Sequence, residues 1–198
     1  MPKDAPKAAP QTAPKRRRNA EATREAIIEA ARVRFMSSAY EQVSLRDVAA
    51  AAGIDPALVI RYFGSKEGLF ERVLTTELVA PEHGVGDPKT FGERMAEAAF
   101  RNDPAHHRYE TINTAIWSAA SPTAARIVKR DVEERFIKPI AASLEGPDAE
   151  VRAALIMALM MGTAILHRML EVPPLDGDDL SAVTPHLASV LQHLADGD

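Results

Sequence analysis

The chain of 198 residues contains no cysteine. This absence excludes disulfide bonds, thiolate metal sites and a cysteine nucleophile, and it fits a reducing, cytoplasmic location. The first residues are charged and rich in proline, without an apolar stretch, so no signal peptide is expected. The most apolar run, residues 153–166, has 14 residues. Because a membrane span needs about 20 apolar residues, we expect no membrane partner.

Motifs that would indicate catalysis are also missing from the sequence. It contains no glycine-rich phosphate loop and no nucleophile elbow. Among the six histidines, His106 and His107 are adjacent and would diverge on a helix, and no carboxylate lies at the spacing of a zinc enzyme. The pair Glu133 and Glu134 is typical of a solvated helix face. We therefore expect no enzyme, no metal and no cofactor.

No stretch alternates between apolar and polar residues between two turns, so no sheet is expected. Helix starts instead recur as a capping residue or glycine followed by proline, as in Asp87-Pro88 and Ser121-Pro122. Outside the first third, helices are predicted over 65–79, 88–101, 105–119, 122–138, 148–171 and 178–195. With three further helices before residue 65, the prediction is an all-α fold of about nine helices. Pro139 is predicted to end or kink the helix over 122–138.

The net charge of −4 conceals an uneven distribution of charge. Residues 1–70 hold 12 Lys and Arg against 8 Asp and Glu, whereas residues 71–198 hold 12 against 20. A basic N-terminal third on an acidic body is typical of a DNA-reading domain joined to a domain that does not bind DNA. The alternative is a chance scatter of surface charges.

Residues 44–70 carry the most specific pattern of the chain. Ser44 can cap a short helix, and Gly53 supplies the positive φ that a tight turn between helices requires. Asp55 followed by Pro56 is typical of an N-cap and first position of a second short helix. Two helices of about two turns each bury too little surface alone. They indicate a helix-turn-helix whose second helix enters a DNA major groove.

The run over 53–69, Gly-Ile-Asp-Pro-Ala-Leu-Val-Ile-Arg-Tyr-Phe-Gly-Ser-Lys-Glu-Gly-Leu, resembles the signature of the tetracycline-repressor (TetR) family. The stretch over 23–35, with Ile27, Ala31 and Phe35 four residues apart, is similar to the first helix of that family. The motif-bearing match covers about 19–75, and beyond it only an all-helical pattern of suitable length is shared. The resemblance implies a DNA-binding domain over 19–65 and a helical effector-binding and dimerisation domain over 66–198.

The resemblance also implies DNA-contacting residues. Arg46 matches a position that reaches a base edge, where its guanidinium suits guanine; the alternative is a solvated arginine beside Asp47. The groove-facing positions of the second motif helix are Ala57, Leu58, Ile60 and Arg61. Phosphate contacts are expected from Ser44, Tyr62 and Lys66, although Tyr62 can equally be a packing residue.

Ile60 departs from the family pattern, which usually has a tyrosine at this position. The sequence Leu58-Val59-Ile60 makes the reading helix unusually apolar, with Val59 expected in the core. Apolar side chains contact thymine methyl groups but cannot pair with base acceptors. We therefore expect either contacts that favour A·T pairs or an affinity that depends on Arg46, Arg61 and the basic arm.

Residues 1–18 lack apolar periodicity and end in a basic run with Arg16, Arg17 and Arg18. This composition predicts a disordered arm. Because the arm precedes the first motif helix, we expect it to contact phosphates or to enter a minor groove. The alternative is a tail that only improves solubility.

The helix predicted over 148–171 is apolar on nearly every face, so a partner must cover the side that the chain's own core leaves open. In the resembling family the last two helices pair with those of a second subunit. Expected interface residues are Leu155, Ala158, Leu159, Gly162, Ile165, Leu187 and Leu191. The alternative is a buried central helix of a monomer. An effector pocket, also implied by the resemblance, would draw on Phe91, Met95, Tyr109, Asn113, Thr114 and Trp117, although spaced aromatic residues are more often plain core.

The sequence therefore predicts a homodimeric, ligand-responsive transcriptional repressor that binds a near-palindromic DNA operator and is released by a small-molecule effector. The competing class is a helical module that binds small molecules or proteins and does not read DNA. The apolar reading helix is the feature that favours this alternative.

Overall fold

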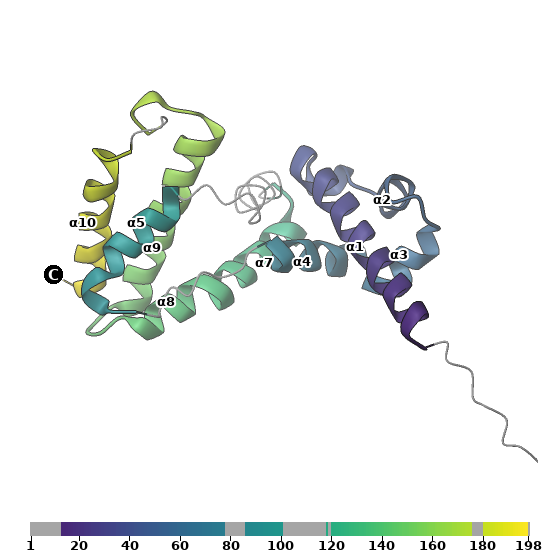
Figure 1. Ribbon diagram of the computed structural model, residues 1–198, viewed down its shortest axis with the longest axis horizontal. Helices are drawn as coiled ribbons and strands as arrows, with labels where there is room; N and C mark the ends of the chain where they lie inside the picture. Colours follow the sequence, from purple (N-terminus) through teal and green to yellow (C-terminus); the bar gives the residue numbers. More distant parts are fainter. Residues whose placement is uncertain (1–12, 78–85, 101–117, 119, 176–179, 198) are drawn as a thin grey trace, which may run out of the picture.

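The computed structural model describes residues 13–77, 86–100, 118, 120–175 and 180–197. These residues form helices and turns, without a strand in any of the described ranges (Figure 1). The α-helices are α1 (Ala13–Ser37), α2 (Leu45–Ala51), α3 (Pro56–Phe63), α4 (Lys66–Glu77), α5 (Phe91–Phe100), α7 (Pro122–Val132), α8 (Lys138–Ser143), α9 (Ala149–Ala164) and α10 (Val183–Asp196). Because α7 continues into α8, the described ranges hold eight separate helices, which confirms the predicted all-α fold. The helix predicted over 105–119 lies almost wholly outside the described residues.

Helices α1 to α4, residues 13–77, form one end of the molecule and are called the head (Figure 1). Their core contains an aromatic trio. The ring of Phe70 lies 4.9 Å from that of Phe35 and 5.1 Å from that of Tyr40, both edge to face. The same hydrophobic cluster includes Ala124 and Ile127 of α7. The core of the head therefore extends beyond its own four helices.

Helix α1 begins earlier than the sequence predicted. The backbone over 13–18, expected to belong to a disordered arm, is helical in the first turns of α1. Alanine, lysine and arginine are good helix formers, and Pro14 stands in the first turn, where its missing N–H costs no hydrogen bond. The prediction is wrong for these six residues, and residues 1–12 lie outside the described ranges.

Helices α5, α8, α9 and α10 form the opposite end, called the body. Their hydrophobic cluster is centred on Ile140, Ile156 and Leu191, none of which is exposed. Helix α10 packs most extensively on α5. A Cβ added at Gly92 would lie 2.1 Å from the carbonyl oxygen of Ala188, so glycine is required for this close approach.

A single long helix joins the head to the body. It runs from α7 through a π-helical turn, Glu133–Ile137, into α8. Pro139 does not end this helix, although an end was one of the two predicted outcomes, and the chain stays helical to Ser143. Because proline lacks an N–H and its ring crowds the carbonyl one turn earlier, the added residue of the π turn adjusts the hydrogen bonding before it, and the N–H of Lys138 bonds to the carbonyl of Glu133.

Helix α9 extends through a second π-helical turn, Ile165–Met169. The resulting 21-residue helix is, by length and composition alone, long and apolar enough to cross a membrane. The apolar helix is therefore longer than the 14-residue run indicated, but length and composition alone do not overturn the expectation that the protein has no membrane partner. The helix contains Arg152, whose side chain is 8 % exposed and hydrogen-bonds to backbone carbonyls of the body. Only 22 % of the apolar stretch is buried inside the protomer.

Candidate nucleic-acid interface

The turn between α2 and α3 has the geometry of a Schellman motif. The N–H of Ile54 bonds to the carbonyl of Ala49 at 3.0 Å, and the N–H of Gly53 bonds to that of Ala50 at 3.2 Å. Gly53 has a φ of 67°, which a side chain would disfavour. The motif ends α2 and redirects the chain into α3 after only four residues. The two helices therefore form a helix-turn-helix.

Both motif helices have side-chain caps. The hydroxyl of Ser44 accepts a hydrogen bond from the backbone N–H of Asp47 at 3.1 Å and donates to the carboxylate of Asp47 at 2.6 Å. The carboxylate of Asp55 accepts from the N–H of Ala57 at 2.7 Å, and Pro56 stands at the first position of α3. These caps hold α2 and α3 although each has at most eight residues.

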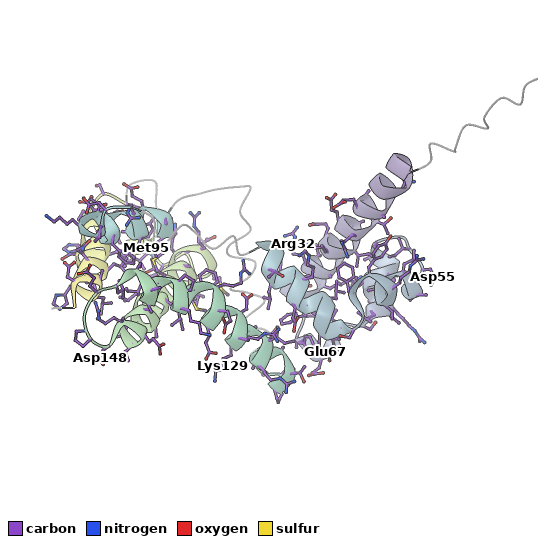
Figure 2. The ribbon with its side chains drawn as sticks, turned by 90° about the horizontal axis from the view of Figure 1, so that it is seen from below. Arg32, Asp55, Glu67, Met95, Lys129 and Asp148 are labelled. Carbon is purple, nitrogen blue, oxygen red and sulfur yellow. The ribbon has the colours of Figure 1, made fainter. Side chains whose placement is uncertain are left out.

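Helix α3 presents a short face to solvent at the far end of the head. Ala57, Ile60 and Arg61 are exposed, and the side chain of Ile60 is 55 % exposed. Val59 is completely buried in the head's core, and Leu58 is half-buried. Figure 2 labels Asp55, at the start of this helix, at the opposite end of the molecule from Asp148 of the body. Helix α3 therefore begins at the end of the molecule far from the body, and its exposed side chains are open to a ligand.

Arg46 is exposed on α2. The carboxylate of neighbouring Asp47 is engaged by the hydroxyl of Ser44. Within the described ranges Arg46 forms no ion pair, so its guanidinium is available for another partner. An exposed Arg46 is compatible both with a contact to a base and with the alternative of a solvated arginine beside Asp47.

Lys66 opens α4 beside the head's aromatic trio. Its ammonium lies 4.2 Å from the centre of the Tyr40 ring, which is a cation–π contact. Burial lowers the pKa of Lys66, whereas the negative charges of Glu41 and Glu67 act in the opposite direction. Burial also raises the pKa of Tyr40 above its ordinary value. Lys66 is thus half-buried and partly engaged within the head.

Tyr62 lies half-buried on α3 and packs against the head's hydrophobic cluster. The guanidinium of Arg24, on α1, lies 5.8 Å from the centre of its ring. Sequence reasoning missed Arg24, because the contact depends on how α1 crosses α3 and no local spacing records it. Arg16, Arg17 and Arg18 belong to the helical backbone of α1. The basic run is therefore continuous with the helix that supports the motif.

Three further residues, the N-cap of α7 and two arginines of α7 and its π-helical extension, contact the head, and nothing in the sequence indicated these contacts. Ser121 hydrogen-bonds Glu41, Arg130 pairs with Glu71, and Arg135 reaches the end of α4. The Ser121-Pro122 cap was recognisable in the sequence, but its partner is 80 residues away along the chain.

The expected pocket residues of the body divide into two groups. Phe91 and Met95 are 3 % and 4 % exposed and belong to the body's hydrophobic cluster. They are core residues, because the apolar face of α5 packs on α10 and α9. The remaining expected pocket residues, Tyr109, Asn113, Thr114 and Trp117, lie outside the described residues.

The expected interface residues fall into two groups, those on the open side of α9 and those packed against the body's own cluster. Leu155 and Ala158 are exposed on α9, and Gly162 and Ile165 are half-buried there. Leu159 and Leu187 pack against the body's own cluster. Leu191 is completely buried in that cluster, so its assignment to a subunit interface is wrong. The apolar stripe of α10 faces α5. The periodicity of its apolar residues does not show which element covers the stripe.

Comparison with known proteins defines the class of protein. Residues 27–73 match the family described as bacterial regulatory proteins of the tetR family, and residues 89–194 match the tetracyclin repressor-like C-terminal domain. The first match covers the helix-turn-helix and its supporting helices, and the second covers most of the body. The fold is that of a helix-turn-helix regulator with a helical C-terminal domain. The chain belongs to the TetR family.

A curated relative and several solved structures agree with this membership. The HTH-type transcriptional repressor BdcR of Escherichia coli K12 is 36 % identical over 77 residues, which are 37 % of this chain and 39 % of BdcR. The structure of NalD, the secondary repressor of the MexAB-OprM multidrug efflux pump in Pseudomonas aeruginosa, has a TM-score of 0.66 at 20 % identity and covers 88 % of this chain and 95 % of its own. The structure of SCO0857, a TetR-family regulator of Streptomyces coelicolor, has a TM-score of 0.58 at 24 % identity. The match covers 95 % of this chain and 99 % of that one. The structural likenesses show a shared fold.

Proposed function

We propose that this protein is a cytoplasmic, homodimeric transcriptional repressor without enzymatic activity, which binds a near-palindromic operator and is released by a small-molecule effector. The observation that carries the proposal is the helix-turn-helix at the tip of the head, with Arg46, Ile60 and Arg61 exposed on it. The curated relative BdcR is a transcriptional repressor, and it is similar to this chain over 77 residues. Family membership supports the same class of activity.

Base reading is assigned to α2 and α3. The guanidinium of Arg46, which has no ion-pair partner in the described ranges, suits the O6 and N7 acceptors of guanine. Ala57 and Ile60 contact thymine methyl groups, because neither offers a hydrogen bond to a base. Arg61 supplies a further charge to the groove. The reading face therefore combines one directional contact with an apolar surface.

Phosphate contacts hold the head on the duplex. Arg16, Arg17 and Arg18 supply the largest local concentration of positive charge, next to the helix that supports the motif. Ser44 and Tyr62 offer hydroxyl groups, and Ser44 would exchange its hydrogen bond to Asp47 for one to a phosphate. Lys66 contributes by leaving the ring of Tyr40, against which it lies in the absence of DNA.

The dimer seam is assigned to the open face of α9. Val151, Leu155, Ala158 and Gly162 recur at helical spacing on one side of α9, and Val151 and Leu155 are 60 % and 48 % exposed. A Cβ added at Gly162 would meet no atom within 4 Å, so the space beside it is open to a second helix. Such an exposed apolar stripe is typical of a protein interface. Two-fold symmetry of the dimer then requires a near-palindromic operator.

The proposal is tested by selecting DNA from a random double-stranded library with the purified chain and measuring affinity by mobility shift. Arg46→Ala is expected to cost about 1–3 kcal/mol of binding free energy and to relax the preference at one base pair in each half-site. Arg126→Ala, which removes an equal charge from an exposed position of α7, is the matched control and should leave that preference unchanged.

Ile60→Tyr restores the usual residue of the family at an exposed position. The variant is expected to fold normally and to change the base preference, because it adds a hydroxyl to the reading face. If the wild type selects no sequence from the library, the alternative interaction module that does not read DNA replaces the proposal. Loss of folding in Ile60→Tyr would show that the register assigned to α3 is wrong.

A further inference from the structure

Helix α7 is packed into the core of the head. Ala124 is completely buried and Ile127 is 7 % exposed, both within the cluster formed by α1 to α4. The same continuous helix reaches the body through α8, where Ile140 is buried in the second cluster. One helix thus connects the two cores, and its attachment to the head determines how the head is oriented on the body.

A hydrogen bond fixes the N-terminal end of α7 to the head. The hydroxyl of Ser121 donates to the carboxylate of Glu41 at 2.6 Å and accepts from the N–H of Ala124 at 3.3 Å. Ser121 is 4 % exposed, so the bond is shielded from water. One hydroxyl therefore both caps α7 and binds the segment between α1 and α2.

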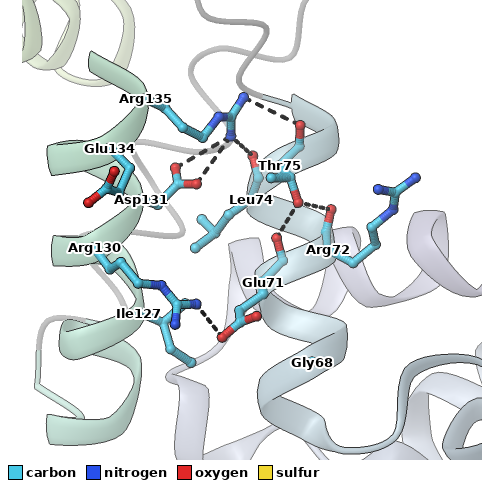
Figure 3. A pocket seen from close by; sticks show the side chains of 10 residues that line it. All are labelled: Gly68, Glu71, Arg72, Leu74, Thr75, Ile127, Arg130, Asp131, Glu134 and Arg135. Carbon is cyan, nitrogen blue, oxygen red and sulfur yellow. Dashed lines mark hydrogen bonds and ion pairs between the residues drawn. The ribbon is translucent and has the colours of Figure 1, made fainter. Parts of the chain in front are cut away.

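Two arginines make further contacts along α7 and its π-helical extension, as Figure 3 shows. The guanidinium of Arg130 lies 2.5 Å from the carboxylate of Glu71 on α4. Arg135 donates to the carbonyl oxygens of Leu74 at 3.2 Å and of Thr75 at 3.4 Å. These carbonyls belong to the last turn of α4 that the structure describes. Arg135 therefore holds this turn of α4 by charge-assisted hydrogen bonds to its backbone.

Arg135 is itself held in place. The carboxylate of Asp131, one turn earlier, lies 3.2 Å from the same guanidinium, and both side chains are largely shielded from solvent. A cavity of about 330 Å³ remains between α4 and this helix, and its lining includes Glu71, Leu74, Arg130 and Arg135. Because side chains do not fill this space, apolar packing alone does not set the angle between the two helices there.

We propose that Ser121, Arg130 and Arg135 are positioning residues that fix the head on α7 and thereby set the distance between the two reading helices of the dimer. The inference rests on the proposed function and specifies how half-site spacing is determined. Neither arginine contacts DNA in this account. Their effect on binding depends on the geometry of the operator rather than on its base sequence.

The test uses the full chain and the half-site that the wild type selects from the random library. Duplexes are made in which the separation of the two half-sites changes by one base pair at a time, and the affinity for each is measured. Four variants are compared: Arg135→Gln, Glu41→Ala, Glu71→Arg, and the double variant Glu71→Arg with Arg130→Glu. Glu41→Ala removes the bond to the head but leaves Ser121 as the cap of α7. Lys129→Ala is the matched control, because the one ion pair of Lys129 within the described ranges joins it at 3.7 Å to Glu133 on its own helix.

The wild type and Lys129→Ala are expected to prefer one spacing sharply. In Arg135→Gln and Glu71→Arg the ratio of affinities between the preferred spacing and its neighbours should fall by about twofold to fivefold, the factor that an ion pair of this exposure supplies. The exchanged pair Glu71→Arg with Arg130→Glu should restore the ratio. A ratio that stays at the wild-type value in every variant, whatever happens to thermal stability, would overturn the inference.

A second measurement does not depend on DNA. Since the chain has no cysteine, spin labels can be placed at the exposed positions Ala50→Cys in the head and Ser189→Cys in the body. Labelled chains are diluted with unlabelled ones so that only distances within one subunit are recorded. The distance distribution should broaden in Arg135→Gln and Glu41→Ala but not in Lys129→Ala. If the wild type selects no DNA, the proposed function fails, and an unchanged width in this experiment would separately refute the positioning role.

Discussion

Arg152 offers the most quantitative test of how the body is held together. Its guanidinium donates to the carbonyl oxygens of Pro147 at 3.1 Å, Leu194 at 3.0 Å and Ala195 at 2.8 Å, and also to that of Glu145. Two of these carbonyls lie near the end of α10, and two lie in the loop before α9. One buried side chain therefore ties together segments more than 40 residues apart.

Arg152→Ala removes the guanidinium, so four backbone carbonyls lose the hydrogen bonds that they accept from it. A buried polar group that loses its partner costs about 1–3 kcal/mol, but the carbonyls near the chain end regain some hydration. We therefore expect the free energy of unfolding to fall by about 3–5 kcal/mol, because a hydrogen bond to a charged group contributes about 1.5–3 kcal/mol and the four bonds share one side chain. At about 2–4 °C for each kcal/mol in a protein of this size, the melting temperature should fall by about 6–20 °C.

The measurement is thermal and urea denaturation followed by far-UV circular dichroism. All variants are compared at one chain concentration, because the stability of a dimer depends on concentration. Arg126→Ala, at an exposed position of α7, is the control and should change the unfolding free energy by no more than about 0.5 kcal/mol. If Arg152→Ala is as stable as this control, the assignment of Arg152 as the clamp of the body is refuted.

Three further outcomes follow from the charges and the exposed faces. Replacing Arg16–Arg18 by alanine should weaken DNA binding equally on all sequences and lower the slope of log affinity against log salt by up to about 2.7 for each subunit, or about 5.4 for the dimer, whereas an unchanged slope would exclude phosphate contacts. Ala158→Glu should give a monomer in sedimentation, because it places a charge in the proposed seam, and a dimer mass would assign the interface elsewhere. Hydrogen bonds from its own backbone N–H and from Ser65 lower the pKa of Glu67, so the wild type should lose stability as the pH falls below the ordinary pKa of a glutamate, about 4.3, and Glu67→Gln should make this loss less steep in acid titration.

Local features of the fold were predictable because their causes lie within a few residues. Ser44, Asp55 and Ser121 each cap a helix through a backbone N–H two or three residues ahead, and the sequence alone indicated all three helix starts. Gly53 has the positive φ that the turn requires. The helix-turn-helix could therefore be identified from one sequence.

Features that depend on distant partners could not be predicted in the same way. The periodicity of α10 marks Leu191 as apolar but does not say whether α5 or a second subunit covers it. The effect of Pro139 depends on whether a π-helical turn forms before it, and the long helix that results is held at both ends by separate cores. The contacts of Arg130 and Arg135 with α4 join residues about 60 positions apart. No local spacing encodes such a contact.

The central claim, a symmetric dimer that reads DNA, is tested most directly by hydroxyl-radical protection of a duplex selected from the random library. We expect two protected half-sites related by two-fold symmetry, with centres about 34–36 Å apart or slightly more along the duplex. Arg46→Ala should weaken protection of both half-sites together, because each subunit contributes one copy of this residue. A single asymmetric footprint, or no protection at concentrations at which the wild type is folded, would contradict the account.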